Sequence, residues 1–254
     1  MRVLPQMLQC GGVLTSTALL LGAAGRPADP SVANRRACVA FNQLNDRIRD
    51  QTIDRVQAQQ QLAALLPQLD TYYTACGGSA VALGADVFPI DGYNAAAIGG
   101  VKGSGYQSAN YDYFAGNRHR GHPAHDIFIQ DRNQNGCDDR TRQPVAVRAL
   151  TGGVVVAMST NWRTGSPLRG GNYIWVYEPA AHSLFYYAHN ATVRVELGAL
   201  IRPGDILATV GRTGLNASRA RSPTHLHLMQ LTLDARSWPL PTDCYPRLRR
   251  ARIL

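Results

Sequence analysis

Residues 121–129 read Gly121-His122-Pro123-Ala124-His125-Asp126-Ile127-Phe128-Ile129, a polar segment that runs into a β-type stretch. Side chains alternate across a strand, so His122 and Asp126, four positions apart, share one face while His125 points to the other. Residues 224–228, Thr224-His225-Leu226-His227-Leu228, place two histidines on one face in the same way. A β scaffold can therefore bring four polar side chains together without a helix.

Short β-type runs separated by Gly, Pro and Asn make up most of the chain after residue 85. The runs are 126–129, 154–158, 173–177, 184–189, 206–210 and 225–233, and the pairs Gly152-Gly153, Gly170-Gly171 and Pro203-Gly204 mark turns. No internal repeat or second long helical pattern interrupts them. The pattern predicts a mainly β domain over residues 86–240, either an antiparallel sandwich or an open barrel.

The region before this domain has a helical pattern instead. Apolar residues recur at three- and four-residue spacing from Asn34 to Leu69, and the pattern breaks at residues 50–52, where Thr52 is expected to cap a second helix. We interpret residues 34–76 as a small helical hairpin and the Gly/Ala-rich residues 77–85 as a hinge. Its apolar stripe is expected to be packing surface, with partner binding as the alternative.

The first 25 residues have the features of an export signal. Arg2 precedes an apolar stretch from Gly11 to Leu21, and the small residues 22–25 offer a cleavage site. The apolar stretch is too short for a confident transmembrane span, so the mature chain is expected to have none. Residues 26–33 then form a linker. The alternative is a disordered or helical N-terminus of a cytosolic protein.

Cysteine usage agrees with export. Removing Cys10 with the signal leaves an even number of cysteines, Cys38, Cys76, Cys137 and Cys244. Four cysteines in an oxidising compartment commonly form two disulfides, and proximity favours Cys38–Cys76, which leaves Cys137–Cys244. The alternative is four reduced thiols. No pair has CxxC spacing, which argues against a structural zinc site or a redox motif.

The composition is that of a folded protein that favours anionic partners. The 26 Lys and Arg residues exceed the 17 Asp and Glu residues, giving a formal net charge of +9. Nucleic acid, anionic lipid and acidic cell-wall polymers all fit such a surface. The one dense basic cluster lies in residues 241–254, which we interpret as a solvated tail. Without a zinc-finger spacing, recognition helix or aromatic ladder, no nucleic-acid partner is expected.

Two histidines and one Asp match the ligand count of a catalytic zinc site, which keeps one position open for water. The chain supplies them in an HxxxD motif, a later Tyr187-Ala188-His189 and a final HxH motif. The HxxxD motif or the HxH motif alone is weak evidence, but the ordered combination of all three motifs is much more specific. Serine-based catalysis is less favoured, because Ser222 near His225 has neither a nucleophile elbow nor an acid partner.

These motifs resemble those of lysostaphin-type zinc endopeptidases, which act on bacterial peptidoglycan. The Gly-punctuated stretch 197–214, ending in Gly211-Arg212-Thr213-Gly214, adds to a resemblance that covers about residues 86–233. One departure is Ala124-His125, where the family commonly has Gly before an apolar residue. The resemblance implies that His122, Asp126 and His227 are zinc ligands. It implies that His189 and His225 act on the water and the transition state.

The implied function is zinc-dependent hydrolysis of peptide cross-links in peptidoglycan, in the periplasm or after secretion from a bacterium. Zinc lowers the pKa of its bound water to about 7. Without an HExxH glutamate a histidine must take the proton, and whether His189 or His225 does so stays open. The alternative is a catalytically silent module of the same fold that binds cell wall or regulates other hydrolases. The complete ligand set favours the enzyme.

Residues 131–139 match the first half of a calcium loop. Oxygen-bearing side chains at alternate positions and Gly136 for the turn suit Ca²⁺. The candidate ligands are Asp131, Asn133, Asn135 and Asp139. Position twelve is Arg142 rather than a bidentate Glu, so an Asn/Asp-rich turn is slightly preferred over bound calcium.

Overall fold

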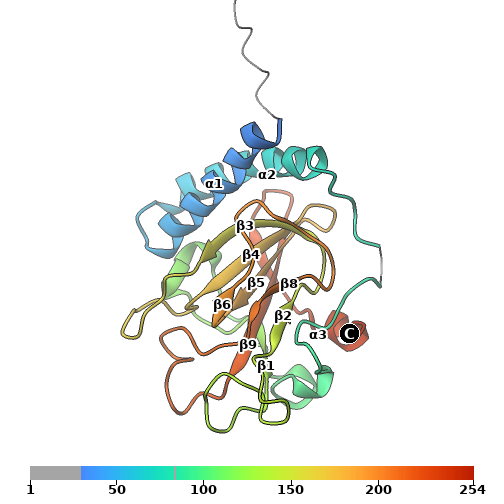
Figure 1. Ribbon diagram of the computed structural model, residues 1–254. Coiled ribbons are helices and arrows are strands. Elements are labelled where there is room, and N and C mark those ends of the chain that lie inside the picture. Colours follow the sequence, from blue (N-terminus) through green and yellow to red (C-terminus); the bar gives the residue numbers. More distant parts are fainter. Residues whose placement is uncertain (1–29, 83) are drawn as a thin grey trace, which may run out of the picture.

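The computed structural model describes residues 30–82 and 84–254 (Figure 1). The predicted export signal and Cys10 lie outside the described residues. Two long helices, α1 (Pro30–Arg49) and α2 (Arg55–Ala75), form the predicted hairpin. Helix α1 begins at Pro30 rather than at Asn34, so the last four residues of the predicted linker are helical. No helix in the described part of the chain is long and apolar enough to cross a membrane.

The turn between the two helices differs from the prediction at the cap. The side chain of Asp54 accepts a hydrogen bond from the backbone N–H of Gln57 at 3.0 Å, so Asp54 is the N-cap of α2. Thr52, the predicted cap, instead donates its hydroxyl to the carbonyl of Arg47. Both residue types are good caps, and only the position at which the chain re-enters the helix distinguishes them.

The remainder of the chain is mainly β, as predicted, and its two antiparallel sheets are open rather than closed into a barrel. The larger sheet has the order β1-β9-β5-β4-β3-β7, with β10 paired to β9, and the smaller has the order β2-β8-β6. The strands are β1 (Ala124–Phe128), β2 (Ala146–Arg148), β3 (Gly153–Ser159), β4 (Tyr173–Glu178), β5 (Ser183–Ala188), β6 (Thr192–Val193), β7 (Leu200–Ile201), β8 (Ile206–Thr209), β9 (His225–Leu233) and β10 (Pro239–Thr242).

Alternating side chains of the larger sheet divide the protein into two cores. On one face, Val155, Ile174 and Phe185 pack with residues of the smaller sheet, such as Leu207. On the opposite face, residues such as Tyr173, Trp175 and Leu231 pack against the buried side of the helical hairpin, which contributes Phe41, Leu44, Ile48, Leu62, Leu66 and Leu69. In Figure 1 both helices lie across the end of the sheet that contains β3 and β4. The hairpin and the larger sheet therefore share a hydrophobic core.

The C-terminal segment is docked on the domain rather than solvated. It continues from β10 into a short helix, α3 (Tyr245–Arg250), whose Leu248 is 1% exposed. The guanidinium of Arg247 forms an ion pair with Asp86 at 2.6 Å, and Arg252 exchanges backbone hydrogen bonds with residues 86 and 88. The predicted solvated tail is therefore wrong, because apolar and paired residues are interspersed among its arginines.

The four cysteines of the described chain are free thiols, so the structure contains neither predicted disulfide. Burial raises the pKa of Cys38 and of Cys244 to about 12, which keeps both thiols protonated at neutral pH. Their surroundings are those of buried, small hydrophobic residues, the alternative considered for the sequence.

Candidate metal centre

Strand pairing brings the two histidine motifs together. Strand β9 lies between β1 and β5, and its register places His227 directly opposite Asp126 on one side and Ala188 on the other. His122 precedes β1 and exchanges backbone hydrogen bonds with Gln107. His122, Asp126 and His227 consequently meet on the face of the sheet that also carries the helical hairpin.

Three donor atoms converge closely enough to hold one metal ion. One ligand atom each from His122, Asp126 and His227 lies within 4.8 Å of the others, and this is the one such cluster that the described residues contain. Asp126 Oδ1 is 3.2 Å from His122 Nε2 and 3.0 Å from His227 Nδ1. Ligands about 2.0–2.2 Å from a tetrahedral zinc lie roughly 3.3–3.5 Å apart. Two nitrogens and one oxygen at these separations fit zinc.

Hydrogen bonds fix which nitrogen of His122 faces the site. Its Nδ1 lies 3.0 Å from the carbonyl oxygen of Gly105. Because a carbonyl only accepts, Nδ1 carries the proton and Nε2 is the free ligand atom. Such a second contact is typical of histidines that bind metals, since it sets both the tautomer and the orientation of the ring.

The proton affinities of all three side chains are perturbed, and that of Asp126 suits a cation. Burial disfavours the charged form of Asp126, but its close contacts with the His122 and His227 rings outweigh it and hold the carboxyl pKa well below its usual range. Burial would lower the pKa of His122, yet the bond to Asp126 raises it overall. Burial lowers the pKa of His227 despite the same carboxylate. Asp126 is therefore ionised and supplies the negative charge of the cluster.

His189 and His225 lie beside this cluster with matching orientations. His189 Nδ1 is 2.8 Å from the carbonyl oxygen of Thr213, and His225 Nδ1 is 2.7 Å from that of Pro223. Each therefore carries its proton on Nδ1 and leaves Nε2 free. The two ring centroids are 4.9 Å apart, and His225 Nε2 is 3.7 Å from Asp126 Oδ1.

The proton affinity of His189 is strongly reduced. Burial is the main cause, and the neighbouring His225 and His227 add to it, so the pKa of His189 lies well below its usual value. At neutral pH the ring is uncharged and can accept a hydrogen bond or a proton through Nε2. The backbone of His189 has φ +68°, an uncommon conformation for a histidine, which directs the side chain as it leaves β5.

The cluster opens into a cavity of about 210 Å³ lined by the five side chains and by several residues that the sequence motifs did not identify. Among these are His119, Arg169 and Tyr186. His119 and Arg169 lie in irregular segments, and Tyr186 follows the apolar pattern of β5, so no local signal marked them. Burial, aided by Arg169, lowers the pKa of His119 to about 4.

His125 lies apart from the cluster, as the alternation of β1 predicts. Its fully buried side chain bonds to the carboxylate of Asp243 through Nε2 at 2.8 Å and stacks on Tyr106. The ring thus joins the back of β1 to the C-terminal segment. His125 is a packing residue on the opposite face from His122 and Asp126.

The predicted calcium ligands form a turn instead of a cation site. The carboxylate of Asp131 accepts the backbone N–H groups of Asn135 and Gly136 and the hydroxyl of Thr224. The side chains of Asn133, Asn135 and Asp139 likewise accept backbone N–H groups of the same loop. These oxygens are occupied by turn hydrogen bonds, and calcium is not supported. The Asn/Asp-rich turn accounts for the pattern.

Residues 132–236 match the model of peptidase family M23. The chain contains a peptidase M23 domain. The match confirms the resemblance to lysostaphin-type peptidases that the motifs indicate. Its range covers less than half of the chain: it includes His189, His225 and His227 and begins after His122 and Asp126. No curated protein matches the chain significantly in sequence.

Solved structures that resemble the chain around its M23 domain include three bacterial proteins. Lysostaphin from Staphylococcus simulans is 23% identical, the match covers 52% of this chain and 44% of that one, and the TM-score is 0.35. A zinc-containing peptidase from Vibrio cholerae is 19% identical, with 67% and 41% covered and a TM-score of 0.40. A protein from Ruminococcus gnavus described as LytM is 23% identical, with 89% and 93% covered and a TM-score of 0.44. The chain spans less than half of the length of the first two of these proteins.

Proposed function

We propose that this protein is a zinc-dependent endopeptidase that hydrolyses peptide cross-links of bacterial peptidoglycan. The observation that carries the proposal is the convergence of His122, Asp126 and His227 beside two further histidines within one cavity. The family of the domain supports peptide hydrolysis. A net charge of +9 favours approach to an anionic cell-wall polymer. The substrate lies outside the cytoplasmic membrane, so the proposal requires the export that residues 1–25 predict.

The three ligands would hold zinc with one position left for solvent. Bound zinc would polarise the scissile carbonyl and make a coordinated water more acidic at neutral pH. Asp126 contributes the charge that balances the cation, and the carbonyl of Gly105 holds His122 in the ligating tautomer. Asp126 lies on β1, His227 on β9 and His122 in the segment that leads into β1.

His189 and His225 would transfer the proton. A water that attacks a peptide carbonyl must lose a proton, and the departing amine must gain one. Both histidines present Nε2 and hold Nδ1–H against a backbone carbonyl, so each can accept a proton at Nε2 and later donate it. We assign the transfer to the pair, because both side chains line the cavity beside the ligand cluster.

Metal content and hydrolysis measured together test these roles. We expect His122→Ala to lose both zinc and activity, and His189→Ala to keep zinc but lose hydrolysis. His182→Asn, in an exposed turn, is the matched control and should keep both. Zinc is measured by elemental analysis and hydrolysis by zymography on purified peptidoglycan. Loss of zinc from His189→Ala would reverse the assignment of ligand and proton carrier.

The same assay distinguishes the enzyme from a silent module of the same fold. An endopeptidase clears peptidoglycan, stops when a chelator is added and recovers when zinc is restored. A binding or regulatory module leaves the substrate intact under all three conditions. Mass spectrometry of the released fragments would then identify the peptide bond that is cut.

A further inference from the structure

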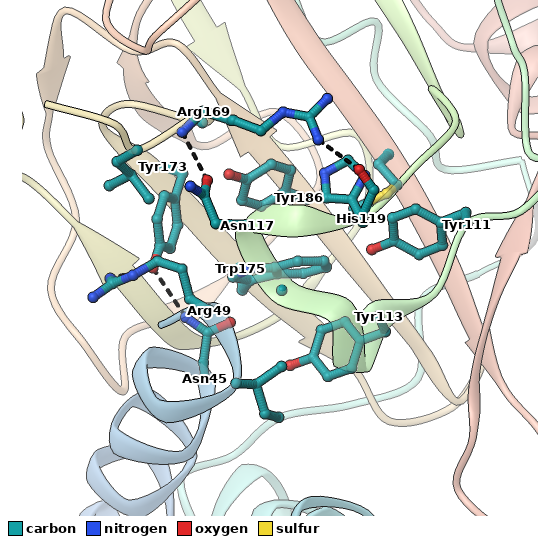
Figure 2. Close-up of a pocket in the computed structure, with 15 residues that line it drawn as sticks. Asn45, Arg49, Tyr111, Tyr113, Asn117, His119, Arg169, Tyr173, Trp175 and Tyr186 are labelled. Atoms are coloured by element: carbon teal, nitrogen blue, oxygen red, sulfur yellow. Dashed lines mark hydrogen bonds between the residues drawn. The ribbon is translucent and has the colours of Figure 1, made fainter. Parts of the chain in front are cut away.

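A second cavity lies next to the metal centre, between the larger sheet and the helical hairpin (Figure 2). Its volume is about 70 Å³, enough for a few water molecules or one small side chain. Helix α1 supplies part of its wall through Asn45, Ile48 and Arg49. His119, Arg169, Gly170 and Tyr186 line both this cavity and the one at the metal centre, so the two are adjacent.

Aromatic side chains make up the floor of this second cavity. Trp175 and Tyr186 have ring centroids 4.5 Å apart, and Tyr173 lies 5.3 Å from Tyr186. Figure 2 shows these rings between the α1 residues and Arg169. The hydroxyl of Tyr173 accepts hydrogen bonds from Asn45 and Arg49 and thereby fixes α1 to the sheet. The floor is a preformed surface of the kind that binds small organic groups.

The cavity contains one positive charge that the described residues leave unpaired. The guanidinium of Arg49 is neutralised by Asp46 and Asp50, each at 2.6 Å. The guanidinium of Arg169 forms no ion pair within the described chain. Its Nη1 donates to the carbonyl of His119 at 2.6 Å, and its backbone N–H donates to the side chain of Asn117. Its other side-chain donors have no described protein acceptor.

Backbone contact holds the α1 wall in place. Gly116, in the segment before His119, lies so close to the end of α1 that an added Cβ would be 2.2 Å from the carbonyl oxygen of Ile48. The hairpin is therefore packed directly on the segment that leads to His122. A ligand in the cavity would contact the hairpin and the metal-binding domain together.

We infer that this cavity is a substrate subsite for a small residue that carries a carboxylate, with Arg169 binding the carboxylate. The inference rests on the proposed function. A guanidinium presents several coplanar N–H donors that match the two oxygens of a carboxylate. The small volume limits the residue to about the size of alanine, and the adjacent metal centre would receive the peptide bond near it. The hairpin thus takes part in substrate selection.

Two peptides of glycine and alanine test the subsite. They share one sequence and differ in ending with a free carboxylate or a carboxamide, and kcat/KM is measured for each. We expect the zinc-loaded enzyme to prefer the carboxylate by about 10- to 100-fold, the usual effect of a charge-assisted hydrogen bond. Arg169→Gln should bring this ratio close to one. Arg163→Gln, an exposed arginine of the same loop, is the matched control and should keep the ratio.

The ratio separates recognition from structural damage. A variant that only disturbs the fold lowers both rates and leaves their ratio unchanged, and that result for Arg169→Gln would overturn the inference. Equal rates for the two peptides with the unmodified enzyme would overturn it as well, while leaving the proposed hydrolysis intact.

Binding provides a readout that does not need hydrolysis. Titration calorimetry of the two peptides into the His189→Ala variant should show tighter binding of the carboxylate. Adding Arg169→Gln should remove the difference. If the protein hydrolyses neither peptide nor peptidoglycan but shows this pattern, the subsite stands and the proposed function fails. Equal binding of both peptides contradicts the subsite.

Discussion

Gly214→Ala is expected to damage the site through the backbone that holds His189. Gly214 has φ +114°, a conformation that side chains rarely adopt, and an added Cβ would lie 2.4 Å from the carbonyl oxygen of Arg169 and 2.9 Å from His189 Nδ1. Thr213, the preceding residue, supplies the carbonyl that accepts from His189 Nδ1 at 2.8 Å. An alanine at position 214 must therefore move the group that orients this histidine.

The expected magnitude follows from comparison with Gly165→Ala. Gly165 has φ +92° but no atom within 4 Å of an added Cβ, so its substitution adds conformational strain alone, about 1–2 kcal/mol. Gly214→Ala adds the displacement of a carbonyl and a histidine ring, and should lower the free energy of unfolding by about 3 kcal/mol or more. Loss of the oriented histidine should also reduce kcat by about 100-fold.

Urea denaturation, steady-state hydrolysis and zinc analysis are the measurements. Zinc content should stay near that of the unmodified protein, because Gly214 contacts none of the three ligands among its nearest atoms. Gly165→Ala should keep full activity. If Gly214→Ala is as stable and as active as Gly165→Ala, the orientation of His189 by this turn is not a requirement, and the reasoning is refuted.

Three further substitutions probe charge and packing. The pKa of His119 is lowered to about 4 by burial and by Arg169, so the unfolded chain binds the proton more tightly and stability is lost as pH falls from about 6.5 to 4. Between pH 7 and pH 4.5 the free energy of unfolding of the metal-free protein, measured by urea denaturation, should fall by up to about 3 kcal/mol more than that of His119→Gln. Equal losses in the two proteins would contradict this prediction. Tyr173→Phe removes the acceptor of two hydrogen bonds from α1 and should lower the unfolding free energy by about 1–3 kcal/mol, whereas an unchanged urea midpoint would show that the hairpin docks without them. Arg247→Met leaves the buried Glu178 without its cation and breaks the ion pair with Asp86. The free energy of unfolding, measured by thermal unfolding, should therefore fall by about 3 kcal/mol at pH values where both carboxyl groups are ionised. An equal loss at pH 3 would attribute the effect to packing instead.

The parts of the site that follow from local alternation could be predicted from the sequence. A period of two places His122 with Asp126 and His225 with His227, whatever the rest of the fold. Long β-type runs such as 173–177 and the hairpin helices carry enough periodic residues to be recognised. Strands of two to four residues, such as β6 and β7, carry too few.

Features that depend on distant partners could not be predicted. The pairing of Asp126 with His227 is a matter of sheet register between segments about 100 residues apart. Arg169 and His119 reach the cavity from irregular loops whose paths no sequence pattern specifies. The oxygens of Asp131 illustrate the converse, because a calcium-like spacing also suits an Asx-type turn that satisfies its own backbone N–H groups.

The position of the hairpin explains why the site lies where it does. His227, Met229 and Leu231 alternate along one face of β9, and the last two belong to the core that the hairpin covers. This face of the larger sheet is therefore shared: apolar residues lie under α1 and α2, and polar residues follow where the helices end. Without the hairpin, Tyr173, Trp175 and Leu231 would be exposed as a contiguous apolar surface beside the metal centre. The hairpin is thus a structural part of the face that carries the ligand cluster, and α1 also supplies part of the wall of the cavity that Arg169 lines.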